Sequence, residues 1–316
     1  MYNYMNSSES LEYLQQKKIL IAGGTGFIGS HLVSKLVLLK SHIIVVSRHR
    51  PKIYSKNVKY ITADLTSTEC VNKLSREKFD IVVNLTGESN RINTEKVPTV
   101  NTFAVTNILL TLIKKNLLIK FVHLGSRLEY GRAKYLPVNE KHPTLPKDIY
   151  SIEKLLSSSL INRFCTYFNI PFTIIRASNT YGPHNKFKFN NHNLINYYID
   201  AAVKKQKLTV FGSGRQKRDF IFIDDLISAI VLVLISNKSN GQIYNVGYGK
   251  PISFYSFVKL IADEANVKVK LRKWPKEYLA IETGDYYADI SKIMNSLGWQ
   301  PAVSFREGIK MSLRQL

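Results

Sequence analysis

The sequence predicts an α/β fold in which a doubly wound parallel sheet is joined to a smaller, mixed α/β lobe nearer the C-terminus. From residue 17 onward, short β-rich runs alternate with amphipathic runs, which is typical of a parallel sheet covered by helices on both faces. A glycine-rich turn lies directly between the first β-rich run and the helical run after it. From about residue 182 the pattern changes, because loops rich in Asn and Lys interrupt shorter strands.

The elements follow in order along the chain. The strands expected in the main sheet are Lys18–Ala22, His42–Val46, Val58–Thr62, Ile81–Leu85, Lys120–Leu124 and Phe172–Ala177. A helix is expected to begin near Asp148 and to end before Pro171. The later strands are expected at Leu208–Phe211, Phe220–Ile223 and Ile243–Val246, and the later helices at Asp224–Ser236, Ser253–Asn266 and Asp289–Leu297.

Size and composition indicate a soluble globular protein of the size of an enzyme. The chain has 316 residues, 45% hydrophobic and 22% charged, so it can bury a sizeable core. We expect residues 1–181 to form the larger domain, with a return segment near 219–248, and residues 182–316 to form mainly the smaller lobe. Cys70 and Cys165 are too few and too far apart for a disulfide framework or a metal knuckle, so no metal site is expected.

The polar first residues and the short apolar runs of the chain are typical of a cytoplasmic protein. Residues 1–16 are polar and carry Glu9 and Glu12, without the basic start and apolar run of a secretory signal. The longest apolar run, Leu226–Ile235, is too short to span a bilayer. We therefore expect a cytoplasmic protein with no membrane span.

The net charge of +22 raises the question of a polyanionic partner such as nucleic acid. The lysines are scattered along the whole chain, and no arginine-rich arm is present. This distribution favours general composition over nucleic-acid binding. A non-catalytic or RNA-binding protein that keeps the same sheet remains the alternative from another class.

The glycine-rich turn predicts a dinucleotide site of the Rossmann type. Gly23 permits the tight turn, Gly26 lets a pyrophosphate approach the backbone, and Gly29 allows the helix to pack closely on the strand. The phosphates then lie at the positive end of the helix. The residues of this turn expected to contact the cofactor are Gly23, Thr25, Gly26, Phe27, Ile28 and Gly29.

The ends of the next strands indicate which dinucleotide fits. At the end of the second strand, an acidic residue would accept hydrogen bonds from the ribose of NAD. The chain instead reads Ser47-Arg48-His49-Arg50 there. Ser47, Arg48 and Arg50 are assigned to the cofactor. Two guanidinium groups can contact a 2′-phosphate, which predicts NADP, with NAD possible. Further cofactor contacts are expected after the third and fourth strands, from Asp64 at the adenine, Leu65, Leu85, Thr86 and Gly87.

A Tyr-x-x-x-Lys step joins Tyr150 to Lys154 in the predicted helix that begins near Asp148. Residues four positions apart on a helix lie on the same face, so the phenol and the ammonium are neighbours there. A free phenol has a pKa of about 10, so a nearby cation is needed to stabilise the phenolate at neutral pH. The pair therefore predicts an acid–base catalyst for hydride transfer, in which a proton must move at the oxygen of the reacting carbon.

Several further short motifs follow one another along the chain. They are Asn101 in a Val-Asn-Thr-Phe-Ala stretch, Ser126, Glu129-Tyr130-Gly131, Arg176, Asn179, Tyr181-Gly182-Pro183, Arg218-Asp219-Phe220, Asp224-Asp225 and Tyr244-Asn245-Val246-Gly247. Together with the glycine turn and the Tyr–Lys pair, they resemble the extended short-chain dehydrogenase/reductase family, also called the NAD-dependent epimerase/dehydratase family. The likeness covers nearly the whole chain and implies a cofactor domain followed by a substrate lobe.

This resemblance implies roles for individual residues. Tyr150 would be the acid–base group, Lys154 would hold the nicotinamide ribose and lower the pKa of the phenol, and Ser126 would bind the reacting oxygen. Asn101, Tyr150 and Lys154 are assigned to the cofactor, with a local helix hydrogen bond as the alternative for Asn101. Substrate contacts are implied for Ser126, Arg127, Asn179 and Arg218.

The resemblance also implies a nucleotide-sugar substrate and hydride transfer at C4 of the sugar. A 4-keto-sugar reductase and a 4-epimerase stay open, with a slight preference for reduction because Arg48 and Arg50 favour NADP. A 4,6-dehydratase is the disfavoured alternative, since Arg127-Leu128 stands where those relatives carry Asp-Glu.

Two further expectations concern charge and assembly. Glu282 precedes Gly284-Asp285 where relatives often carry a second arginine. Because a carboxylate there opposes a diphosphate, either neighbouring Lys and Arg residues compensate or the anionic part of the substrate differs. Glu129 is expected to be a surface carboxylate at a strand end, with a substrate contact as the alternative. A homodimer is implied through the segments near Val97–Asn116 and Ser151–Asn169.

Overall fold

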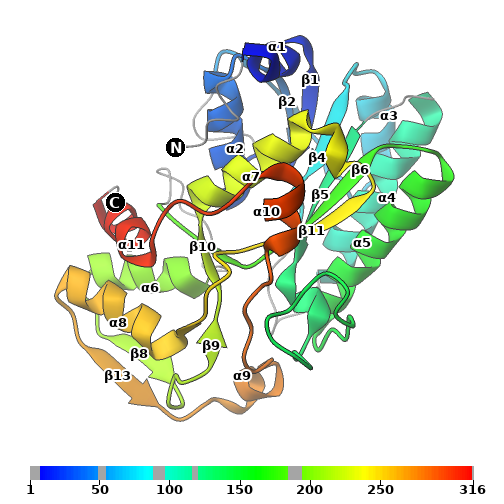
Figure 1. Cartoon of the computed structure of the whole chain (residues 1–316). Helices are drawn as coiled ribbons and strands as arrows, with labels where there is room; N and C mark the ends of the chain where they lie inside the picture. The colour runs from blue at the N-terminus through cyan, green and yellow to red at the C-terminus, as the bar shows by residue number, and fades with distance from the viewer. Residues whose placement is uncertain (1–7, 49–54, 88–96, 116–119, 184–193, 315–316) are drawn as a thin grey trace.

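A seven-stranded sheet forms the centre of the chain. The computed structural model describes residues 8–48, 55–87, 97–115, 120–183 and 194–314 (Figure 1). The sheet has the order β11-β6-β5-β4-β1-β2-β3, and every neighbouring pair is parallel. Its strands are β1 (Lys18–Ala22), β2 (His42–Ser47), β3 (Val58–Thr62), β4 (Ile81–Asn84), β5 (Lys120–Ser126), β6 (Phe172–Ala177) and β11 (Gln242–Val246).

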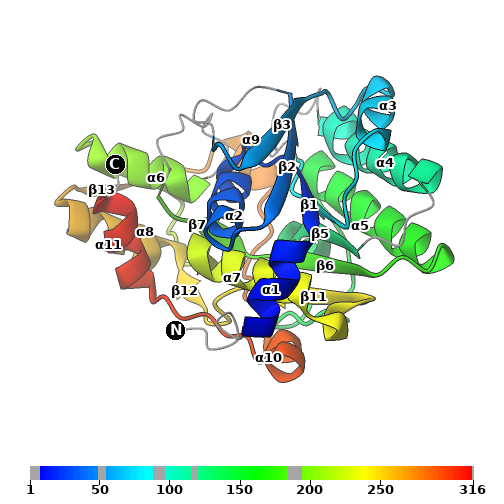
Figure 2. The same ribbon diagram turned by 90° about the horizontal axis from the view of Figure 1, so that it is seen from above.

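Helices cover both faces of the sheet, as the alternation of apolar side chains requires. In β1, Ile19 and Ile21 join a core that includes residues of α2 and α7, whereas Leu20 and Ala22 join a second core with residues of α3, α4 and α5. Figure 2 shows α2 and α7 on one side of the sheet and α4 and α5 on the other. The flanking helices are α1 (Ser8–Gln16), α2 (Phe27–Leu38), α3 (Glu69–Ser75), α4 (Val97–Lys115), α5 (Ile149–Tyr167), α7 (Ile223–Ile235) and α10 (Ser291–Leu297). The predicted doubly wound α/β fold is therefore confirmed.

The smaller lobe is built from short strand pairs and three helices that pack together, α6, α8 and α11 (Figure 1). Its helices are α6 (Leu194–Val203), α8 (Phe254–Ala265), α9 (Lys276–Ala280) and α11 (Phe305–Arg314). Its strands pair as β8 (Leu208–Phe211) with β13 (Val269–Arg272), β9 (Lys217–Arg218) with β12 (Ile252–Ser253), and β7 (Asn179–Tyr181) with β10 (Phe220–Phe222). The described residues also form short 3₁₀ turns at η2 (Arg127–Tyr130) and η3 (Asn237–Ser239).

Most element ends lie within two residues of the prediction, and the differences have local causes. Residues 242–246 belong to the main sheet as β11, because this strand pairs in parallel with β6 although it follows the start of the smaller lobe. β13 was not predicted, since only Val269 of its four residues is even partly buried and its sequence carries little strand pattern. β13 forms because it pairs with β8, although its own sequence does not indicate a strand.

Candidate active site

The glycine turn between β1 and α2 leaves no room for side chains at two positions. Gly23 has a φ of 79°, and a Cβ there would lie 3.0 Å from the carbonyl of Leu85. A Cβ on Gly29 would lie 2.3 Å from the carbonyl oxygen of Gly23, so this glycine lets α2 pack against the turn. Gly26 is the N-cap of α2 and has no side chain with which to cap the first amides. Those amides point out of the helix end, in the geometry that binds a pyrophosphate.

The other residues predicted in this turn, Thr25, Phe27 and Ile28, are partly exposed beside it. Their positions leave them accessible to a ligand above the turn. The site is therefore open at the end of α2, where a dinucleotide would place its phosphates.

The ends of β2 and β3 bring Arg48 and Asp64 close together. Asp64 accepts hydrogen bonds from the amide (2.9 Å) and hydroxyl (2.7 Å) of Thr66. These bonds, with a smaller contribution from the positive charge of Arg48, hold the pKa of Asp64 below its usual value. Arg48 itself is exposed directly after β2 ends at Ser47. Arg50 lies outside the described residues.

Leu65 follows Asp64 and is buried, so its side chain contributes to the core beneath the site. Its carbonyl accepts a hydrogen bond of 2.8 Å from the side chain of Asn107 on α4. This bond ties the end of β3 to the helix on one face of the sheet.

The end of β4 brings together three predicted residues that are far apart in sequence. A Cβ on Gly87 would lie 3.1 Å from Nζ of Lys154 and 3.2 Å from Oδ1 of Asn101. Asn101 is 2% exposed on α4, so it lies inside the site. The absence of a side chain at Gly87 leaves a cradle between a strand end and two helices.

Lys154 is buried on α5 and is held by two backbone carbonyls. Its ammonium donates to the carbonyl oxygens of Leu124 (3.0 Å) and Thr86 (3.2 Å). Burial lowers the pKa of Lys154 to about 8, against the opposing effect of the Glu129 carboxylate. The group therefore keeps most of its positive charge at neutral pH. Burial, with a smaller contribution from the same charge, lowers the pKa of His123 well below its ordinary value.

Tyr150 lies in the first turn of α5, one helical turn before Lys154, and is partly exposed. α5 begins here because Asp148 accepts a hydrogen bond of 2.8 Å from the amide of Ser151 and caps the helix. Residues four apart share a helix face, so the phenol and the ammonium are directed to the same side. The Tyr–Lys spacing is thus realised on a helix, as predicted.

Ser126 ends β5 and serves as the N-cap of η2. Its hydroxyl accepts from the amide of Leu128 (3.1 Å), and its own amide donates to Oε1 of Glu129 (2.8 Å). A hydroxyl has one hydrogen to donate and two lone pairs. The cap uses one lone pair, which leaves the hydrogen able to bind an oxygen of a ligand.

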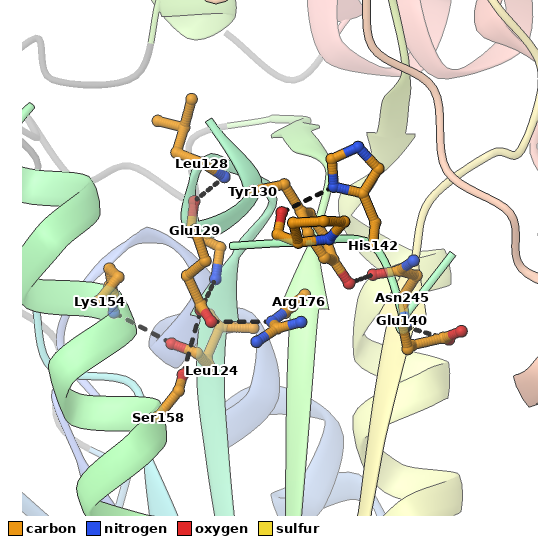
Figure 3. Close-up of polar contacts among 12 residues, drawn as sticks. Leu124, Leu128, Glu129, Tyr130, Glu140, His142, Lys154, Ser158, Arg176 and Asn245 are labelled. Atoms are coloured by element: carbon orange, nitrogen blue, oxygen red, sulfur yellow. Dashed lines mark hydrogen bonds and ion pairs between the residues drawn. The ribbon is translucent and has the colours of Figure 1, made fainter. Parts of the chain in front are cut away.

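Glu129 is fully buried, so the expectation of a surface carboxylate was wrong (Figure 3). Its Oε2 accepts from Nε of Arg176 at 2.8 Å, and its Oε1 accepts from the hydroxyl of Ser158 at 3.1 Å. A Cβ on Gly125 would lie 2.3 Å from Oε1, so glycine is needed to admit the carboxylate. Register explains the pairing, because Gly125 on β5 stands opposite Arg176 on β6.

The sequence does contain a signal for this residue. Ser126 and Glu129 form the Ser-x-x-Glu pattern of a capping box, which the structure shows with both hydrogen bonds made. The pattern indicates that the carboxylate turns back toward the strand end. The arginine partner could not be read from the local sequence, since it comes from another strand.

Tyr130 continues the buried network to β11, the edge strand of the main sheet. Its hydroxyl donates to Oδ1 of Asn245 at 2.7 Å, and the amide of Asn245 donates to Glu140 at 2.8 Å (Figure 3). The guanidinium of Arg176 lies 4.6 Å from the centre of the Tyr130 ring. Burial raises the pKa of Tyr130 to about 12, so this tyrosine stays protonated and serves to hold the loop before α5.

The residues predicted to contact the substrate fall into two groups. Arg127 is buried, and its Nε donates to Oδ1 of Asn179 at 3.0 Å. Asn179 in turn donates to the carbonyl of Asp219 at 3.3 Å, next to Arg218. Arg218, however, forms an ion pair with Glu282 of the same chain. The structure therefore brings Arg127 and Asn179 together and gives Arg218 a carboxylate partner.

Asp219 organises the loops behind these residues. The carboxylate is fully buried and accepts bonds from Ser178 (3.0 Å), from the amide of Tyr248 (2.9 Å) and from the amide of Ala288 (3.1 Å). Burial raises the pKa of Asp219 to about 6 in spite of these bonds. The residue between β6 and β7, the loop after β11 and the chain after α9 therefore meet at one side chain.

In the described part of the chain, no group of three or more His, Cys, Asp or Glu residues could hold a metal ion. Among the helices that the structure describes, none has the length and apolar character needed to cross a membrane.

Comparison with known proteins identifies relatives over most of the chain. Residues 19–247 match the family described as NAD dependent epimerase/dehydratase. A putative UDP-glucose 4-epimerase of Methanocaldococcus jannaschii is 31% identical over 302 residues, which cover 92% of this chain and 96% of the relative. A dTDP-D-glucose 4,6-dehydratase of Homo sapiens is 26% identical over 317 residues and covers 94% and 89% of the two chains.

Solved structures share the fold. An epimerase of Methanothermobacter thermautotrophicus superposes with a TM-score of 0.89 at 22% identity, over 99% of this chain and 96% of that one. A UDP-glucose 4-epimerase of Thermotoga maritima, solved with UDP-glucose, gives a TM-score of 0.86 at 23% identity, over 94% and 98%. The chain therefore belongs to the NAD-dependent epimerase/dehydratase family of extended short-chain dehydrogenases/reductases.

Proposed function

We propose that this chain is an NAD(P)-dependent enzyme that transfers hydride at C4 of a nucleotide sugar, as a 4-keto-sugar reductase or a 4-epimerase. The family acts on nucleotide sugars by epimerisation and dehydration, which agrees with this class of substrate. The observation that carries the proposal is the convergence of Gly87, Asn101 and Lys154 beside the strand that ends at Ser126. Residues from two strand ends and two helices thus meet at one point.

The residues present fit a dinucleotide. The turn at Gly23–Gly29 offers backbone amides to the phosphates, and the cradle at Gly87 leaves space beside Lys154 and Asn101. When bound, a nicotinamide dinucleotide supplies the hydride acceptor or donor. Lys154 and Asn101 would hold its nicotinamide end, and Arg48 and Asp64 its adenosine end.

Proton transfer is assigned to Tyr150. As the sugar carbinol is oxidised, its oxygen gives a proton to the Tyr150 phenolate, and reduction of the ketone reverses that step. Lys154 stabilises the phenolate with its positive charge, which the carbonyls of Leu124 and Thr86 hold in place. The hydroxyl of Ser126 donates to the same substrate oxygen. No further base is needed for either direction.

The structure supports the preference against 4,6-dehydration. Elimination of water requires an additional acid and base next to the reacting hydroxyl. After Ser126 the chain offers Arg127, which is bonded to Asn179, and Leu128, which cannot transfer a proton. The next carboxylate, Glu129, is buried in an ion pair with Arg176.

Substrate recognition is proposed for the region beyond Ser126. Arg127, Asn179 and Arg218 would face the nucleotide diphosphate, with residues 1–181 and the return near 219–248 serving mainly the cofactor and residues 182–316 mainly the substrate. The two cysteines are free and buried, which agrees with a reaction in the cytoplasm.

The direct test is identification of the retained dinucleotide, followed by assays of sugar nucleotides. Mass spectrometry of the purified protein should find NAD or NADP. The protein should then be incubated with UDP- and dTDP-linked hexoses and their 4-keto derivatives. Epimerised product without net change in cofactor indicates a 4-epimerase, and consumption of reduced cofactor by a 4-keto derivative indicates a reductase. No turnover of any member of the panel would contradict the proposal.

Arg48 is proposed to favour NADP over NAD. The Arg48→Ala protein should bind NADP about tenfold more weakly and NAD almost unchanged, because only NADP carries the 2′-phosphate that a guanidinium can pair with. Fluorescence titration of both cofactors measures this. Lys59→Ala, which removes an exposed cation of β3, is the matched control and should alter neither affinity. Equal binding of both cofactors to the unaltered protein would remove the argument.

We also propose a homodimer through α4 and α5. These neighbouring helices leave large apolar side chains exposed, among them Phe103 (55%) and Leu156 (49%). A second copy would cover this face. Sedimentation should give a dimer for the unaltered protein and a monomer for Leu156→Asp, whereas Leu279→Asp on α9, a site of similar exposure, should leave the dimer intact. A monomeric mass for the unaltered protein would refute this assembly.

A further inference from the structure

The ion pair between Arg218 and Glu282 joins β9 to the segment after α9. Nη2 of Arg218 contacts Oε1 of Glu282, and Nη1 donates to the carbonyls of Gly284 and Lys217. The side chains are only 7% and 23% exposed, so water screens the pair poorly. The guanidinium is therefore surrounded by oxygen acceptors from its own chain.

Glu282 is itself held in position. Its Oε1 accepts a second hydrogen bond, of 2.9 Å, from the amide of Gly284. Its backbone carbonyl accepts from Nζ of Lys147 at 2.8 Å, which ties the segment to the loop before α5. Gly284 has a φ of 74°, a conformation that lets the chain turn its amide back toward the carboxylate. The carboxylate is thus built into the turn and does not hang freely from it.

This arrangement changes what Arg218 offers to an anion. An arginine pairs best with a phosphate when its N–H groups form two parallel bonds to the phosphate oxygens. Here one of those groups already donates to a carboxylate and another to backbone carbonyls. A diphosphate that approached Arg218 would have to displace Glu282 or lie next to its negative charge.

We infer that Glu282 is a specificity-determining residue that competes with the substrate diphosphate for Arg218 and weakens the binding of nucleoside diphosphates. The inference rests on the proposed nucleotide-sugar function and concerns the same site. Like charges placed side by side at a partly buried site oppose binding. Recognition would then depend more on the sugar and less on the diphosphate, and the free nucleotide would be a poor inhibitor.

The test compares binding of UDP, dTDP, GDP and CDP by calorimetry, with the cofactor at saturation so that the dinucleotide site is filled. Glu282→Gln keeps the shape of the side chain and removes the charge, and should tighten the best of these ligands by at least about tenfold. Glu282→Asp, which retracts the carboxylate, should tighten binding less. Glu277→Gln on α9 removes one exposed negative charge five residues away and should leave the affinity unchanged.

A double variant shows whether the effect passes through Arg218. In the Arg218→Met background, the gain from Glu282→Gln should vanish, because no guanidinium remains to be released. A gain of the same size in that background would mean that Glu282 repels the ligand directly, and it would overturn the assigned competition for Arg218.

The remaining outcomes separate this inference from the proposed function. If the unaltered protein binds a nucleoside diphosphate and both Glu282 variants bind it equally or more weakly, competition is refuted while the proposed function stands. If neither the unaltered protein nor any variant binds the four ligands at millimolar concentration, the nucleotide-sugar function fails and the inference fails with it.

Discussion

Tyr150→Phe is expected to lower kcat by about 10²- to 10⁴-fold, which is the usual contribution of general acid–base catalysis. The substitution removes only the phenolic oxygen, and the proposed reaction has no other group to carry the proton at that position. The helix cap at Asp148 and the carbonyl bonds of Lys154 do not involve this oxygen, so folding should be unchanged. Steady-state kinetics with the substrate identified from the sugar-nucleotide panel measures the loss.

The matched control is Tyr135→Phe, in the loop before α5. Tyr135 is 45% exposed, and its hydroxyl contacts Asn139, so the same chemical change should leave kcat within about twofold. Full turnover by Tyr150→Phe would exclude tyrosine as the proton carrier.

Glu129→Gln is expected to lower the free energy of unfolding by about 3–5 kcal/mol, because it leaves the buried charge of Arg176 without a counter-charge. Glutamine keeps the size of the side chain, so loss of packing contributes little. Urea unfolding of the two proteins measures the difference. Glu77→Gln, which breaks the exposed pair with Lys59, should change stability by no more than about 1 kcal/mol.

The double variant Glu129→Met/Arg176→Met distinguishes lost charge balance from lost structure. It removes both charges, so it should recover much of the stability that Glu129→Gln loses. Equal stability of the unaltered and Glu129→Gln proteins would mean that the pair is not a buried ion pair in solution.

Glu129→Gln should also change how the activity depends on pH. The Glu129 carboxylate raises the pKa of Lys154 against the burial that lowers it to about 8. Removal of the carboxylate therefore lowers that pKa further, and Lys154 loses its proton at a lower pH. The decline of activity on the basic side should begin at lower pH in Glu129→Gln than in the unaltered protein. If the role of Glu129 were purely structural, activity would decline at the same basic pH in both proteins.

Local pattern was sufficient for the sheet, the glycine turn and the helix that carries Tyr150 and Lys154. The strands of the main sheet were predicted to within two residues, because buried parallel strands are short apolar runs that stand out from their flanks. The order of Gly23, Gly26 and Gly29 after a strand, and the four-residue step from Tyr150 to Lys154, are also local. In each case the spacing along the chain sets the spacing in space, since a helix or a tight turn relates near neighbours by fixed geometry.

Contacts between distant segments could not be obtained in this way. Glu129 was expected at the surface, yet parallel pairing of β5 with β6 sets Arg176 opposite Gly125 and provides the partner that allows a carboxylate to be buried. Gly87, Asn101 and Lys154 meet because a strand and two helices pack together, and Arg218 meets Glu282 across 64 positions of sequence. Burial and pairing of a charge depend on which segments the fold makes neighbours, and that neighbourhood is a property of the packed chain as a whole.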